Sequence, residues 1–142
     1  MNDHAINEYL KTLQSRIDTN ESKIVDYVVE QGTDGNWTYS KWHSGRFDAW
    51  YVYNGAPTGG SHYATVGTLY GYRVENIQFP SACTPINTNY HVSATWTVAP
   101  GFAMSAGTVS TQTTTKFTVY CLASQNNKTT VIVNIYVTGR WK

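Results

Sequence analysis

Residues 2–24 read NDHAINEYLKTLQSRIDTNESKI, and this stretch, which contains no glycine or proline, is the only part of the chain with the pattern of a helix. Its apolar side chains recur at intervals of four and three residues, which is the heptad repeat of a coiled coil. The a and d positions, which we call the seam, are Leu10, Ile17 and Ile24 (a) and Ile6, Leu13 and Asn20 (d). A strip this narrow does not cover a globular core, so we expect copies of the chain to bury it. At about 1.5 Å per residue the helix is roughly 35 Å long, which is marginal for a stable isolated helix or coiled coil.

The seam predicts an oligomer, and it favours a trimer over a dimer. Leucine at a beside isoleucine at d, as in the first pair, favours more than two strands, whereas the reverse arrangement in the next heptad favours two. Asn20 lowers the stability of the seam but sets its register, and asparagine at d is similar to the seams of trimeric fibre proteins. The alternative is a surface helix of a monomer, or a helix that breaks at the weak helix formers of residues 18–20.

A change of composition near residue 25 predicts a boundary between a stalk, residues 1–24, and a head, residues 25–142. Seven charged side chains lie in the first 24 residues, whereas the head is rich in Thr, Ser, Gly, Asn, Tyr and Trp. The net charge of +1, without a basic run, disfavours nucleic acid as a partner. No apolar stretch is long enough to insert into a membrane, and the polar N-terminus lacks the apolar segment of a signal peptide. We therefore expect a protein made in a cytoplasm and not exported by the general route.

From Val25 onward the apolar residues alternate, which predicts strands. Residues 31–35 predict a turn, and the alternating runs 36–42 and 46–53 around His43-Ser44-Gly45 predict a hairpin. Further strands are predicted at 69–77 (broken at Gly71), 90–98, 107–110, 116–123 and 130–137. Many short strands joined by Gly- and Asn-containing turns indicate a mainly β fold, with an antiparallel β-sandwich as the head.

The polar residues form no recognisable catalytic or metal-binding motif, so we expect no enzyme activity and no cofactor. The four histidines and two cysteines lack the spacing of metal ligands. We interpret Asp34 as a turn former and Asp48 as a cross-strand partner of Arg46, rather than as a glycosidase pair. Cys83 and Cys121 would form a disulfide if their strands paired, but free buried thiols are favoured in a chain made in a cytoplasm.

Two segments resemble tail proteins of bacteriophages and prophages. Residues 30–45, EQGTDGNWTYSKWHSG, resemble a hairpin of these proteins that reads Gly-x-Trp-x-Tyr-x-Lys-Trp-x-Ser/Asp-Gly, and residues 137–142, VTGRWK, resemble their Gly-Arg-Trp-Lys terminus. The region 68–142 is similar to the H-type lectin sandwich, with its Phe-Pro strand entry, although Lys116 replaces a glycine of that family. Together these matches cover about residues 25–142, with 25–53 as an aromatic hairpin region. They imply a homotrimeric tip of a tail fibre or baseplate, located in the virion tail with other tail proteins.

Aromatic residues are concentrated in the hairpin, and flat aromatic faces stack on sugar rings. Trp50 and Val52 share one face of their strand, opposite Tyr51 and Tyr53. We interpret three tryptophans as structural: Trp37, Trp50 and Trp96. Because loops at the end of a sandwich carry function, we favour the loop at 54–63 and the turn at 125–128 for ligand binding. The predicted ligand-binding residues are Tyr53, Asn54, His62 and Tyr63.

These observations predict an attachment protein that binds a host-surface glycan as a trimer. One alternative is an architectural tail protein whose head docks onto other parts of the virion and has no ligand of its own. Another is a host-encoded lectin, which the absence of a signal peptide disfavours.

Overall fold

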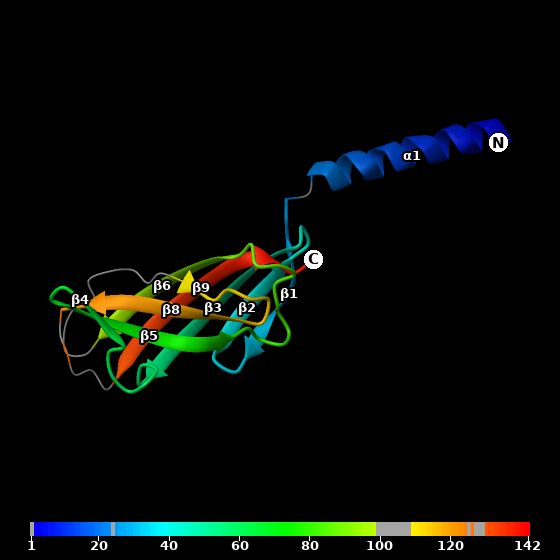
Figure 1. The fold of residues 1–142 in the computed structure, drawn as a ribbon. Helices are drawn as coiled ribbons and strands as arrows, with labels where there is room; N and C mark the ends of the chain where they lie inside the picture. The colour runs from blue at the N-terminus through cyan, green and yellow to red at the C-terminus, as the bar shows by residue number, and fades with distance from the viewer. Residues whose placement is uncertain (1, 24, 99–108, 125, 127–129) are drawn as a thin grey trace.

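The computed structural model describes residues 2–23, 25–98, 109–124, 126 and 130–142, and it contains one helix and two antiparallel sheets. Helix α1 (Asp3–Lys23) projects away from the sheets, with the N-terminus at its far end (Figure 1). Asn2 caps it, because its Oδ1 accepts a hydrogen bond of 2.8 Å from the backbone N–H of Ala5. The predicted helix is confirmed. No helix among the described residues is long and apolar enough to cross a membrane.

The larger sheet has five strands in the order β1-β2-β3-β9-β6. These are β1 (Val28–Asp34), β2 (Trp37–Trp42), β3 (Arg46–Gly55), β9 (Val131–Arg140) and β6 (His91–Val98). The smaller sheet has the order β4-β5-β8-β7, formed by β4 (Ala64–Val66), β5 (Leu69–Gln78), β8 (Lys116–Ala123) and β7 (Val109–Ser110). Because the chain enters β9 from the far end, its C-terminus returns to the end of the head beside the helix (Figure 1). The predicted hairpin, β2 and β3, is confirmed.

The inner faces of the two sheets share one apolar core. Phe47 of β3, Tyr72 of β5 and Phe117 of β8 are completely buried. Trp37 joins the sheets, since its ring lies 6.3 Å from that of Phe117 and its Nε1–H donates a hydrogen bond of 2.8 Å to the backbone carbonyl of Gln78. The head therefore buries its own apolar residues without help from the helix.

The alternation of the hairpin is confirmed, but the interpretation of one tryptophan is wrong. Trp37 and Trp96 are buried, at 4% and 6% exposure, as predicted. Trp50 is 44% exposed, because Phe47 and Ala49 of the same strand fill the core side and leave the opposite face to solvent. The sequence pattern defined the two faces of β3 without telling which of them is inside.

Several element boundaries also differ from the prediction. The first strand starts at Val28 rather than Val25, and it continues through Gln31 to Asp34, so the turn is centred on Gly35 with φ of +59°. Strand β5 passes through Gly71 without a break. Its irregularity is a bulge between Val74 and Ile77 instead, with Asn76 in the left-handed region. Strand β4 was not predicted, and β9 extends three residues beyond its predicted end.

Cys83 and Cys121 are free thiols and both are buried, which confirms the favoured prediction. Burial raises the pKa of Cys83 to about 11 and that of Cys121 to about 12. Both thiols therefore stay protonated at neutral pH.

Candidate functional site

The seam of the helix is exposed along the described part of α1. Ile6 is 41% exposed, Leu10 55% and Ile17 50%, while Leu13 is partly covered and Asn20 is exposed. Ile24, the last predicted seam residue, lies outside the described residues. A row of large aliphatic side chains open to water is the surface that a coiled-coil partner would cover.

The predicted ligand residues Tyr53 and Asn54 lie on opposite faces of β3. The Tyr53 ring packs against the edge of the core, and its hydroxyl donates a hydrogen bond to the backbone carbonyl of Ala56. Asn54 points to the solvent side of the larger sheet. Adjacent residues of a strand cannot serve one site on one face.

The other two predicted ligand residues lie beside the smaller sheet. Tyr63 is 44% exposed, and its ring lies 5.0 Å from the guanidinium of Arg73 and 5.5 Å from the ring of Tyr120. His62 packs edge-on against Tyr70, with ring centroids 5.1 Å apart. The structure thus separates Tyr53 from Asn54 across β3 and places His62 and Tyr63 beside the smaller sheet. The turn at 125–128 lies outside the described residues except for Asn126.

A cleft of about 410 Å³ lies between β5 on one side and the β1–β2 turn and β3 on the other. Its lining includes three aromatic residues (Trp37, Tyr51 and Tyr53) and five polar ones (Asp34, Asn36, Glu75, Asn76 and Gln78). The carboxylates already have partners: Asp34 accepts hydrogen bonds of 3.0 and 3.1 Å from the N–H and hydroxyl of Ser81, and Glu75 lies 3.2 Å from Arg73. Both carboxylates of the cleft are therefore engaged within the protein.

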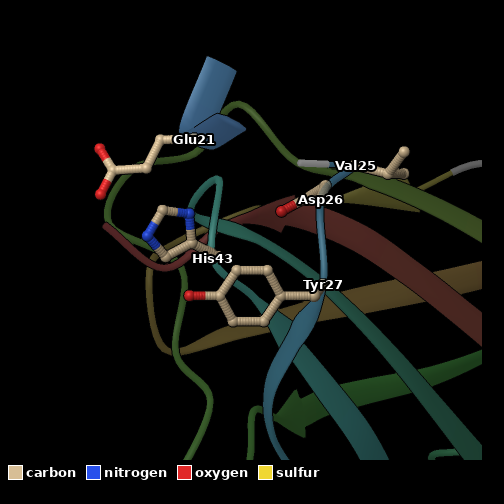
Figure 2. Close-up of a pocket in the computed structure, with 5 residues that line it drawn as sticks. All are labelled: Glu21, Val25, Asp26, Tyr27 and His43. Atoms are coloured by element: carbon tan, nitrogen blue, oxygen red, sulfur yellow. The ribbon is translucent and has the colours of Figure 1, made fainter. Parts of the chain in front are cut away.

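A second hollow, of about 280 Å³, lies where the helix meets the head (Figure 2). The rings of Tyr27 and His43 stack in it, with centroids 4.9 Å apart and an angle of 15° between their planes. Asp26 accepts hydrogen bonds from the N–H and the hydroxyl of Ser44 in the 43–45 turn. The bond from the hydroxyl is the largest cause of a lowered pKa of Asp26, and the bond from the N–H lowers it further. These contacts hold the connection to the helix against the hairpin.

The same turn also holds the C-terminus. The backbone N–H of Trp141 donates a hydrogen bond of 2.8 Å to the carbonyl of Gly45, and Arg140 donates one of 2.8 Å to the carbonyl of Ser44. A Cβ on Gly45, whose φ is +92°, would lie 2.7 Å from the carbonyl oxygen of Lys142. The 43–45 turn and the C-terminal segment are therefore in contact at the end of the head that faces the helix.

A charged cluster lies along β1 and β2, close to the C-terminal segment. Glu30 accepts hydrogen bonds from Lys41, at 3.1 Å, and from the hydroxyl of Tyr39, at 3.0 Å. Both bonds lower the pKa of Glu30, and the bond to Glu30 raises the pKa of Tyr39. The ammonium of Lys41 also lies 5.1 Å from the ring of Trp141. Every charge in this cluster has a partner, which suits a structural role.

The prediction missed a polar network on the outer face of the larger sheet. Asp48 is 7% exposed; its Oδ1 accepts a hydrogen bond of 2.7 Å from Tyr136, and its Oδ2 accepts one of 2.8 Å from Nε1 of Trp42. Arg46 pairs with Asp48 at 3.2 Å and stacks on Trp42 at 4.2 Å. The expected Arg46–Asp48 pair is present, but the two residues are neighbours along one strand rather than partners across strands. Burial is the largest cause of a raised pKa of Tyr136, and the hydrogen bond to Asp48 raises this pKa further.

No three His, Cys, Asp or Glu side chains come together as a metal site in the described part of the chain. Comparison of the chain with protein-family models, with curated proteins and with solved structures found no match.

Proposed function

We propose that this chain is an attachment protein of a bacteriophage or prophage tail, in which a trimeric coiled-coil stalk carries β-sandwich heads that bind saccharide. The observation that carries the proposal is the exposed seam on a helix that projects from a head with a complete core of its own. The resemblance of residues 30–45 and 137–142 to phage tail proteins supports the biological setting. The trimer is favoured over the dimer by Asn20 and by the Leu10 and Ile6 pair.

Attachment through such heads would depend on avidity. Three weak sites on one trimer, multiplied over several fibres, give tight binding without a strong single contact. An aromatic surface with neighbouring hydroxyl and amide groups suits this task, because weak stacking on sugar rings is easily repeated.

The mass of the full chain in solution tests the stalk. Light scattering at micromolar concentration should give three times the mass of one chain, and replacing Leu10 and Ile17 with Asp should give a single copy. Ser15→Asp, a charge placed on an exposed residue outside the seam, is the matched control and should leave the trimer intact. A single copy for the unmodified chain would remove the proposal.

Binding of the full chain to purified cell-wall polysaccharide tests the saccharide part. If the trimer forms but no polysaccharide is retained, the chain is better described as an architectural tail protein that docks onto other virion proteins.

A further inference from the structure

The outer face of β3, β9 and β6 places one exposed tryptophan in the middle of a polar surface. The register pairs Trp50 with Tyr136 and Tyr136 with Ser93, and in the next row it pairs Val52 with Asn134 and Asn134 with Thr95. These residues, which we call the platform, line a shallow hollow of about 230 Å³. The platform consists of Trp50, Val52, Ser93, Thr95, Asn134 and Tyr136. Because alternate residues of a strand share a face, all six point away from the core.

Trp50 is exposed, but its ring packs against a neighbour that is itself fixed. Its ring lies 5.6 Å from that of Tyr136, with a tilt of 41°. The hydroxyl of Tyr136 is fixed by Asp48, which is itself fixed by Trp42 and Arg46. A flat aromatic ring that is already in position loses little conformational entropy when a ligand stacks on it.

The polar part of the platform has hydrogen-bonding capacity to spare. The side chains of Ser93, Thr95 and Asn134 have no hydrogen-bond partner among the described residues. In the cleft beside β5, by contrast, both carboxylates and the hydroxyl of Tyr53 are engaged. The platform thus places unpaired hydroxyl and amide groups directly beside the exposed tryptophan.

We propose that the platform binds a neutral saccharide, with one sugar ring stacked on Trp50 and its hydroxyl groups bonded to Ser93, Thr95 and Asn134. The ligand is neutral because the platform has no charged residue, and the nearest charges, Asp48 and Arg46, pair with each other. This inference rests on the proposed function and adds the site and the ligand class to it.

A second copy of the chain fits the platform less well. A stable interface buries about 800 Å² on each partner, and its centre is enriched in apolar and aromatic residues and depleted in serine. Here the exposed large apolar side chains are Trp50 and Val52, at 44% and 51% exposure, and hydroxyl and amide groups surround them.

The test uses the full chain on an array of neutral oligosaccharides and polysaccharides: α- and β-glucans, galactans, mannans, rhamnans and N-acetylglucosamine oligomers. Trp50→Ala should weaken binding about tenfold or more, and Asn134→Ala less. Tyr63→Ala, in the loop that the sequence favoured for binding, is the comparison variant, and Val66→Ala is the control, because Val66 is an apolar residue of β4 that is 58% exposed. Val66→Ala should bind like the unmodified chain, and the thermal midpoints of all variants should stay within about 5 °C of it, because each substitution removes one partly exposed side chain.

Each other outcome has a definite meaning. Binding that survives Trp50→Ala but is lost in Tyr63→Ala overturns the platform and leaves the proposed function standing. If Trp50→Ala changes the oligomeric mass, the platform is an interface between copies and the inference is wrong. If no neutral saccharide binds, the platform inference fails. The mass of the chain in solution still tests separately whether the stalk forms a trimer.

Discussion

The helix and the head manage their apolar residues in opposite ways. In the head, Phe47, Tyr72 and Phe117 are completely buried by two sheets of the same chain. In the helix, Leu10 and Ile17 are half exposed, and nothing in the described part of the chain covers them. The head therefore buries its core within one chain, whereas the proposed function requires other copies to cover the helix. Changes in the two regions should therefore differ in how their effects depend on protein concentration.

The largest expected effect is in the core of the head. Phe47→Ala should lower the free energy of unfolding by about 3–5 kcal/mol, since it removes a ring that contacts Phe79 and leaves a cavity. Urea unfolding followed by tryptophan fluorescence measures this loss, which should be the same at low and high protein concentration. Val52→Ala, on the outer face of the same strand, should cost much less. A concentration-dependent midpoint for the head would contradict the comparison.

High pH should destabilise the head by about 2–3 kcal/mol near pH 10. The pKa values of Cys83 and Cys121 are about 11 and about 12 in the folded chain, against 9.0 for a free thiol. Their stabilising effect is complete below pH 9 and is lost as the pH rises toward the folded pKa values, because only the unfolded chain releases these protons.

Urea unfolding at about pH 7.5, 9.5 and 10.5 measures this loss, which should approach about 1.4 kcal/mol per pH unit for each thiol. In Cys121→Ala the stability should fall less steeply with pH, by about 1.4 kcal/mol per pH unit, because only one of the two thiols remains. An equal slope in the variant would assign the loss to other groups, such as Tyr90, whose pKa burial raises to about 12.

The sequence predicted the secondary structure better than it predicted which surfaces are free. Strand β8 was predicted with its observed bounds, because alternation and turn residues are local signals. The exposure of Trp50 was not predictable, since it depends on whether Phe47 or Trp50 faces the second sheet, and that sheet is formed by residues distant in sequence. For the same reason the Asp48 network was missed: Tyr136, one of its members, lies 88 residues from Asp48.

The predicted ligand residues illustrate the same limit. The loop position favoured a set of four residues: Tyr53, Asn54, His62 and Tyr63. However, residues that are adjacent in a strand point to opposite faces of the sheet. Tyr53 turned inward, and Tyr63 turned toward Arg73 on the other sheet. The useful signal was already present in the alternation of β3, which separates Trp50 and Val52 from Tyr51 and Tyr53.

A smaller effect is expected from the network on the outer face of the head. Asp48→Asn should cost about 1–3 kcal/mol, because the amide has only one acceptor oxygen for the groups that now bond to two. It should also lower the pKa of Tyr136, which the bond to Asp48 helps to raise. Urea unfolding and the ultraviolet titration of tyrosine measure the two effects. An unchanged stability would mean that Trp42 and Tyr136 bond to water as favourably as they bond to the Asp48 carboxylate.

The smallest effect is expected at the start of the helix. Asn2→Ala removes the side chain that accepts a hydrogen bond from Ala5, and loss of such a cap costs about 1 kcal/mol of helix stability. If the helix is stable only in association, this loss should appear as a lower fraction of oligomer in dilute solution, measured by sedimentation. Asn7→Ala, within the helix, should not weaken association, since alanine is the better helix former. The midpoint of the head should stay the same in both variants. A lower head midpoint in Asn2→Ala would mean that the two regions are energetically coupled, and the exposed seam could then no longer be treated as the independent cause of assembly.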